Sequence, residues 1–286
     1  MQINNPKDDV QDYFKVVGDF RSSGKRSTSM LLRGKDGEAN NYKLSLSKPG
    51  QKEAWMAPRH RHTFEQFRHP ISGDYVIHKD EVLPAGWCAY FPESAYYGPQ
   101  VKSGNLQMIS LQFGGPSGLG YWGMEQCKEA FDRLVAKGRV FEEGFCTWID
   151  EDGKRHNQDA SEAVEAEARG HAVDYPERRY QDVIIMNPDA FSWVKDDAAN
   201  GVAHKTLGSF TERDARIGFV QMEKGAALPF GNEKSPEILF LKEGKVSYDN
   251  RTFDKHTAFG TEKEEAPVTL SAIEPSEFLY LKLPNF

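Results

Sequence analysis

Short apolar runs alternate with turn residues along most of the chain. Runs rich in Val, Ile, Leu, Phe and Tyr are bounded by Gly, Pro, Asp or Asn, which is the pattern of β-strands joined by turns. In the first part of the chain we expect strands at residues 42–46, 60–68, 74–78, 87–91 and 106–113. In the last part we expect strands at residues 182–186, 217–222, 238–241, 245–248, 268–272 and 278–283. Many short strands at this spacing favour an all-β barrel or sandwich that occurs twice.

The middle of the chain has a helical pattern instead. Apolar side chains recur at helical spacing within residues 124–137, and Gly138 follows as a C-terminal stop. Residues 161–169 are a second candidate helix, with Asp159 in an N-capping position and Gly170 beyond the end. The pattern therefore predicts two helices between the two β regions.

These patterns divide the chain into three parts. We expect an N-terminal barrel at residues 1–114, a connector with two helices at residues 115–178 and a C-terminal barrel at residues 179–286. The connector is so polar that we expect it to form no core of its own.

The two β regions repeat one spacing of residues. In the first copy the repeat occupies His60, His62, Gln66 and Gly73. In the second copy the corresponding positions hold Gly231, Glu233, Glu237 and Gly244. Both copies close with a glycine at the same offset, as a tight turn between two strands requires. We infer that one unit is present twice.

The first copy carries candidate metal ligands. Side chains alternate between the two faces of a strand, so His60, His62 and Gln66 would share one face. Two imidazoles and an amide oxygen on one face suit a divalent transition metal such as Fe, Zn, Ni, Mn or Cu. The spacing predicts one such ion in the first barrel, of undetermined identity.

Charge and hydropathy exclude several classes of partner. The net charge of −7, without a stripe rich in Lys and Arg, argues against nucleic acid. No stretch approaches the roughly 18 consecutive apolar residues that span a bilayer, and the first residues lack the apolar centre of a signal peptide. We expect a cytoplasmic protein that binds neither nucleic acid nor a membrane.

A glycine-rich stretch at residues 118–123 matches the GxGxxG pattern of dinucleotide-binding loops. Residues 114–117 separate it from the preceding strand, and Trp122 brings bulk to the place where a phosphate would approach. No alternating series of strands and helices surrounds it. We interpret the stretch as a linker.

The repeated spacing resembles the first motif of the cupin superfamily, G-x5-H-x-H-x3,4-E-x6-G. Gly86 and Pro92 match the start of the second motif, G-x5-P-x-G-x2-H-x3-N. Since both halves fit, the chain resembles a bicupin. The resemblance implies two tandem jelly-roll barrels, with the metal ligands of the first barrel at His60, His62 and Gln66.

Several departures from the cupin motifs lie at ligand positions, and two others replace motif glycines with Ala54 and Ser94. Gln66 stands where the family has Glu, and Tyr97 stands where it has a third histidine. In the second half, Gly231 and Glu233 replace both histidines, and only Glu237 keeps the identity of a family ligand. We therefore expect the second barrel to have lost its metal.

Polar and aromatic side chains near the histidines are candidates for chemistry. Tyr97 and Gln66 are the predicted catalytic residues, because a phenol can ligate, hydrogen-bond a substrate or exchange a proton. Arg68 shares the parity of Gln66 and could hold a carboxylate. With Tyr75 and Tyr90 it forms the predicted substrate-binding set.

The resemblance leaves three functional classes open. The leading hypothesis is a metal-dependent dioxygenase that acts on a small oxygenated or aromatic molecule. The alternatives are an isomerase, cyclase or lyase, with or without metal, and a bicupin that binds a small molecule without catalysis. An apolar run at residues 278–281 could pair with a second subunit, so we predict a homodimer.

Overall fold

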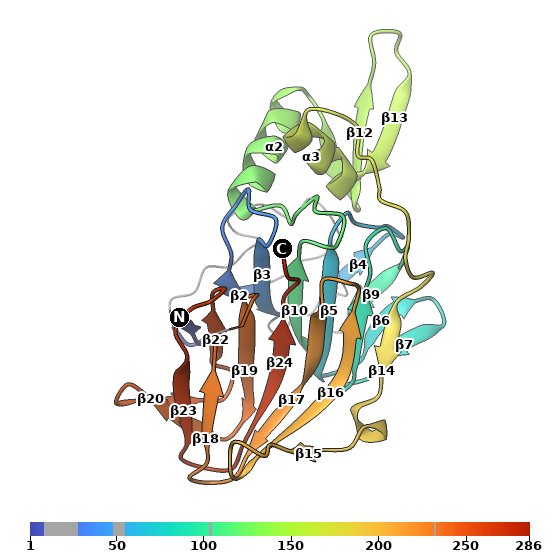
Figure 1. The fold of residues 1–286 in the computed structure, drawn as a ribbon. Coiled ribbons are helices and arrows are strands. Elements are labelled where there is room, and N and C mark those ends of the chain that lie inside the picture. The colour runs from blue at the N-terminus through green and yellow to red at the C-terminus, as the bar shows by residue number, and fades with distance from the viewer. Residues whose placement is uncertain (9–27, 48–54, 103–104, 232) are drawn as a thin grey trace. The chain divides into compact units, whose positions relative to one another are not determined.

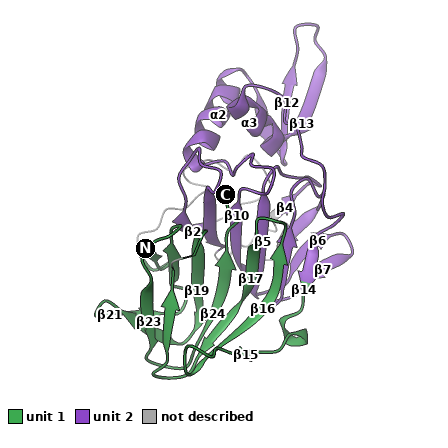
Figure 2. Cartoon of the chain, in the orientation of Figure 1, with its two compact units in different colours: residues 1–10, 186–286 green, residues 11–185 purple. Residues whose placement is uncertain are grey.

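The computed structural model describes residues 1–8, 28–47, 55–102, 105–231 and 233–286. The chain forms two compact units, one of Met1–Val10 with Met186–Phe286 and one of Gln11–Ile185 (Figure 2). Both units consist mainly of antiparallel β-sheets (Figure 1). The predicted all-β class with two barrels is confirmed.

The unit of Gln11–Ile185 contains the first barrel, which is built from two facing sheets. The larger sheet has the strand order β14 (Ile184–Met186), β8 (Cys88–Phe91), β5 (Glu65–Ser72), β10 (Gln107–Phe113), β3 (Tyr42–Ser47) and β2 (Thr28–Arg33). The smaller sheet has the order β4 (Trp55–Ala57), β9 (Gln100–Lys102), β6 (Tyr75–His78) and β7 (Glu81–Leu83). Ala89, Phe91 and Met108 of the larger sheet pack in one core with Ile77 and Leu83 of the smaller sheet. The side chains of that shared core identify the inner face of the barrel.

The same unit contains the two predicted helices. Helix α2 spans Met124–Ala136 and helix α3 spans Ala160–Arg169. The Asp159 carboxylate accepts hydrogen bonds from the first free backbone N–H groups of α3, and Gly170 ends the helix in the left-handed conformation at φ 75°. The bounds of both helices agree with the predicted ranges to within one residue.

The helices have a small core, and the expectation that this segment would form none was wrong. Ala130 and Leu134 of α2 pack on Ala163 and Val164 of α3 and on Cys146. Cys146 lies in a three-stranded sheet that the sequence pattern did not indicate, formed by β11 (Val140–Glu142), β12 (Phe145–Ile149) and β13 (Arg155–Asp159). Small side chains allow close packing of the helices, so few apolar residues suffice.

The other unit contains the second barrel, also built from two sheets. The larger sheet has the order β1 (Gln2–Asn4), β22 (Ala258–Thr261), β19 (Glu237–Glu243), β24 (Ser276–Lys282), β17 (Ala215–Met222), β16 (Val202–Phe210) and β15 (Val194–Lys195). The smaller sheet has the order β18 (Ala227–Phe230), β23 (Val268–Ala272), β20 (Lys245–Tyr248) and β21 (Arg251–Asp254), and a short 3-10 helix spans Pro188–Ala190. Leu228, Leu239, Val246, Phe259 and Phe278 form the centre of its core.

The first strand of the chain joins the last barrel. Ile3 of β1 pairs with Phe259 of β22 in an antiparallel ladder. The predicted boundaries, 1–114, 115–178 and 179–286, instead grouped this strand with the first barrel and set the helices apart. A sequence pattern can indicate a strand without showing which sheet it joins.

Matching turns and registers show the duplication in three dimensions. Gly73 connects β5 to β6 and Gly244 connects β19 to β20, both with positive φ, at 70° and 94°. In the first barrel, Lys43, Gln112 and Gln66 lie at one level of three adjacent strands. In the second barrel, that level holds Arg216, Lys282 and Glu237. Strand β5 therefore corresponds to β19.

Candidate functional site

Polar side chains gather on the inner face of the first barrel. Gln66 and Arg68 project inward from β5, because their register partners on β8, Phe91 and Ala89, belong to the inner core. Tyr75 enters from β6, on the facing sheet. Gln66, Arg68 and Tyr75 are each at most 8% exposed. The structure thus brings together three of the residues that the sequence singled out.

His60, His62 and Tyr97 join this group by a different route from the one predicted. Strand β5 begins at Glu65, and His60 instead forms an isolated antiparallel bridge with Tyr97. The ring centroids of His60 and His62 lie 5.2 Å apart, and those of His60 and Tyr97 lie 4.4 Å apart. The prediction of one continuous strand at residues 60–68 was wrong. The two imidazoles and the phenol nevertheless lie close together.

A chain of hydrogen bonds links the group. The Gln66 Nε2 donates to the Tyr97 hydroxyl at 2.6 Å, and the Gln66 Oε1 accepts from the Arg68 guanidinium at 2.7 Å. Gln112 donates to the same oxygen at 3.3 Å, and Arg68 also donates to the Tyr75 hydroxyl. Both ends of the Gln66 amide therefore have partners within the barrel.

This bonding bears on the predicted metal site. The His60 Nδ1 lies 2.6 Å from the Pro58 carbonyl oxygen, so its N–H donates there and the lone pair is on Nε2, as in many metal-binding histidines. Gln66 does not fit as a third ligand, because its oxygen accepts from a guanidinium whose charge would repel a metal cation. The residues present therefore do not fit an ion held by His60, His62 and Gln66 together.

Arg68 is the buried charge of this group. Its guanidinium lies 4.3 Å from the ring centroid of Phe91 and 5.4 Å from that of Tyr97. Its Nε has no hydrogen-bond partner in the described part of the chain, and no carboxylate among those residues forms an ion pair with it. A buried guanidinium without a carboxylate is suited to receive an anionic group.

Tyr90 lies apart from the other predicted site residues. It pairs with Phe67 on β5, so it projects from the opposite face of the sheet to Gln66 and Arg68. Its hydroxyl donates to Glu65, and burial together with that carboxylate raises the pKa of Tyr90 well above its usual value. The structure does not bring Tyr90 to the inner group.

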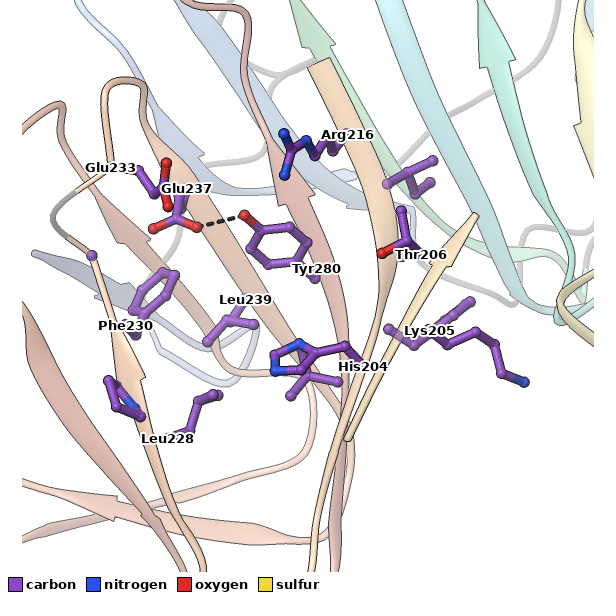
Figure 3. Close-up of a pocket in the computed structure, with 16 residues that line it drawn as sticks. His204, Lys205, Thr206, Arg216, Leu228, Phe230, Glu233, Glu237, Leu239 and Tyr280 are labelled. Atoms are coloured by element: carbon purple, nitrogen blue, oxygen red, sulfur yellow. Dashed lines mark hydrogen bonds between the residues drawn. The ribbon is translucent and has the colours of Figure 1, made fainter. Parts of the chain in front are cut away.

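The second barrel encloses a cavity that sequence reasoning missed (Figure 3). Its volume is about 290 Å³. Its polar lining consists of His204, Lys205, Thr206, Arg216, Glu233, Glu237 and Tyr280. Its apolar lining includes Val220, Leu228, Phe230 and Leu239. A cavity close to the lower end of the range for ligand sites, with both kinds of lining, can hold a small molecule.

Glu237 is the buried carboxyl of this cavity. Tyr280 donates to it at 2.5 Å, and Figure 3 shows the two side chains pointing toward each other. Burial raises the pKa of Glu237, with a further contribution from the negative charge of Glu233. Burial and the Glu237 charge also raise the pKa of Tyr280, so that hydroxyl stays protonated.

The other charges near this cavity form a connected set. Arg216 donates twice to Asp214, at 2.7 and 2.6 Å, and Lys282 donates to Glu233 at 3.0 Å. Although burial raises the pKa of Asp214, hydrogen bonds from Arg216 and Ser209 lower it to about 2. Asp214 is therefore ionised at neutral pH.

A sequence signal for this cavity does exist. Tyr280 and Lys282 alternate with apolar residues in the last strand, and Glu237 occupies the repeat position of Gln66. Because the second copy of the repeat lacks both histidines, the sequence pattern predicted no metal site there, and the polar residues that remain were not assigned to a cavity. Which strands place their polar residues around one space is decided by the closure of the barrel.

Comparisons with known proteins agree with this architecture. No protein-family model and no curated protein sequence matches the chain. Among solved structures, a proposed dioxygenase from Nostoc punctiforme is similar to the whole chain, over 84% of its own length, with a TM-score of 0.58 and 11% identity. Oxalate decarboxylase from Bacillus subtilis, which is described with Mn(II) centres, matches the whole chain over 78% of its length, with a TM-score of 0.54 and 11% identity. The chain has the fold of a bicupin. At this identity the likeness of the chain to these proteins shows its fold alone.

Two kinds of feature are absent from the described residues. No helix there is long and apolar enough to cross a membrane. Within those same residues, no three His, Cys, Asp or Glu side chains come together in a way that could hold a metal ion.

Proposed function

We propose that this bicupin is an enzyme that acts on a small, oxygen-rich molecule bearing a carboxylate or a similar anionic group, bound in the first barrel. The observation that carries the proposal is the buried Arg68 guanidinium, which has no carboxylate partner among the described residues. It lies 5.4 Å from the ring centroid of Tyr97, and the Tyr97 ring in turn contacts His60. An anionic ligand would supply the missing charge. The bicupin fold of the solved enzymes supports a small-molecule site of this kind.

The residues around Arg68 suit proton transfer. Arg68 and Tyr75 would hold the anionic group, and the His60 Nε2 would accept a proton from the bound molecule. Tyr97 would donate a hydrogen bond to an oxygen that gains negative charge during the reaction. These roles belong to an isomerase or lyase.

A metal-dependent dioxygenase is the second candidate. It is favoured by the hydrogen bond of the His60 Nδ1 to Pro58, which presents Nε2 in the manner of a ligand. His60 and His62 would be the ligands of such an ion. Gln66 could become a third ligand only if the hydrogen bond between its oxygen and Arg68 were broken. The metal identity would then be Fe, Zn, Ni, Mn or Cu.

Isothermal titration of oxalate and pyruvate tests the anion site. We expect at least one of them to bind, and Arg68→Gln to weaken that binding by about tenfold or more, because the charged hydrogen bonds are lost. Arg59→Gln is the matched control, since Arg59 is exposed. Unchanged affinity in Arg68→Gln, or no binding of either anion to the parent protein, would overturn the proposal.

Metal analysis separates the two reaction classes. Protein purified without chelator is measured for metal content, and oxygen consumption is followed with catechol and acetylacetone. Turnover without oxygen uptake or bound metal supports the isomerase or lyase. Stoichiometric metal that is lost in His60→Ala, together with oxygen uptake, supports the dioxygenase instead.

A further inference from the structure

The cavity of the second barrel has a charged end and an apolar end. Glu233 and Glu237 lie close together beside the Tyr280 ring in Figure 3, and Arg216 lies on the other side of that ring. Leu228 and Phe230 line the wall away from Arg216. A ligand that fits this space carries a polar head and a short apolar body.

The charged end lacks one positive charge. Asp214, Glu233 and Glu237 are carboxylates, whereas Arg216 and Lys282 are cations. Lys205 also lines the cavity, but its Nζ points away from this end and donates to the Pro188 carbonyl oxygen. Arg216 is engaged by Asp214, and Lys282 donates to Glu233 and Asp214. Glu237 has a hydroxyl partner in Tyr280 but no ion pair within the described residues. When ionised, this buried carboxylate is the charge left without a counter-ion.

A buried hydroxyl without a partner in the described structure lies on the strand beside Glu237. Thr261 pairs with Glu237 across β22 and β19, so the two side chains share the inner face of the barrel. Thr261 is 1% exposed, and its hydroxyl has no hydrogen-bond partner in the described structure. Its methyl group lies close to Gly231, which lines the cavity. Buried hydroxyls are normally bonded, so this one indicates a missing polar partner.

We propose that the second barrel binds a small organic cation, a primary ammonium group on a short apolar body. The ammonium group donates to Glu237 and Glu233, and the body packs on Leu228, Phe230 and Leu239. Its three N–H donors match an acceptor set of the Glu237 and Glu233 carboxylates and the Tyr280 hydroxyl oxygen, all of which line the cavity. This site goes beyond the proposed function and is independent of it, because it uses no residue of the first barrel.

Three probes of equal size and different charge test the head group. Benzylamine, benzyl alcohol and benzoate are titrated separately into the full chain in a calorimeter. We expect benzylamine to bind at least about tenfold more tightly than benzyl alcohol, and benzoate not to bind this site. Equal affinity of the amine and the alcohol, or no binding of the amine, would overturn the proposal without any variant.

Two variants locate the binding. Glu237→Gln keeps the size of the side chain and removes its charge, so it should abolish the preference for benzylamine. Arg68→Gln, in the first barrel, should leave benzylamine binding unchanged. A preference for benzylamine over benzyl alcohol that survives Glu237→Gln in a folded protein, or that is lost in Arg68→Gln, contradicts a site in the second barrel. Loss of oxalate and pyruvate binding in Arg68→Gln concerns the first barrel alone, so the two proposals fail separately.

Discussion

At the level of single residues, the two barrels have kept one geometry and changed its charge. Gln66 and Glu237 occupy the same register position, and so do Lys43 and Arg216. A neutral amide in the first barrel leaves Arg68 as an unpaired cation among aromatic rings. At the same level the second barrel has the carboxyl of Glu237, together with Lys282 where the first barrel has Gln112. These changes of one residue favour an anionic ligand in one barrel and a cationic ligand in the other.

Asp214 provides a pH test at this scale. Its folded pKa, about 2, lies below the ordinary value of 3.8, so its stabilising contribution is present above pH 4 and is lost as the pH falls toward 2. Because the group is about a third exposed, we expect Asp214→Asn to lower the free energy of unfolding by only about 1 kcal/mol at pH 7.

The comparison uses urea unfolding of both proteins at pH 7 and pH 2.5. Asn tolerates the positive φ of 60° at this position, so the backbone is not strained by the change. The difference in stability should shrink at the lower pH. A difference that is the same at both pH values would contradict the assigned pKa.

At the level of secondary-structure elements, the duplication is visible in the turns that follow β5 and β19. Each uses a glycine with positive φ, which residues with a Cβ adopt at a cost of about 1 kcal/mol. The space around the two glycines differs. A Cβ on Gly73 would lie 3.0 Å from the Leu106 Cα, and a Cβ on Gly244 would overlap the Pro275 carbonyl oxygen.

Three alanine substitutions should therefore lower the free energy of unfolding by different amounts, in a fixed order. Gly86 has a φ of 85° and open space around it, so Gly86→Ala should cost about 1 kcal/mol through the backbone alone. Gly73→Ala should cost more, and Gly244→Ala most, with about 1–3 kcal/mol added by overlap. Chemical denaturation of the three variants measures the order. Equal losses would show that the turns relax freely.

At the scale of the whole molecule, the chain begins and ends in the same unit. Strand β1 forms the edge of the sheet beside β22, and Asn5 donates to the Thr257 hydroxyl at 2.9 Å. A variant without residues 2–8 should lose amide protection from hydrogen exchange in β22. Protection in β10, in the other unit, is the internal control. Unchanged exchange in β22 would show that β1 contributes little to the second barrel.

The homodimer stays a prediction at this scale. Strand β24 carries the run at residues 278–281 that suggested it, but this strand lies between β19 and β17 in its sheet and is not an edge. Sedimentation velocity at micromolar concentration measures the oligomeric state. A single species with the mass of one chain, 32.3 kDa, would contradict the dimer.

The sequence alone determined many of the strands, both helices and the duplication. Period-two and helical patterns record which residues share a face, and Gly73 and Gly244 mark turns that require positive φ. The convergence of His60, His62 and Tyr97 was implied by the resemblance to the cupin motifs. These features depend on neighbours in the chain, so they can be recognised without knowledge of distant partners.

Only the tertiary structure decided how those faces are used. Alternation shows that Gln66 and Arg68 share a face, but sheet pairing decides that this face is inside and that Tyr90 is on the other side. The bond from Arg68 to the Gln66 oxygen, and the cavity around Glu237, arise between side chains from different strands. Charge and hydrogen bonding act through space, so the chemistry of each barrel is set by contacts that the order of residues does not contain.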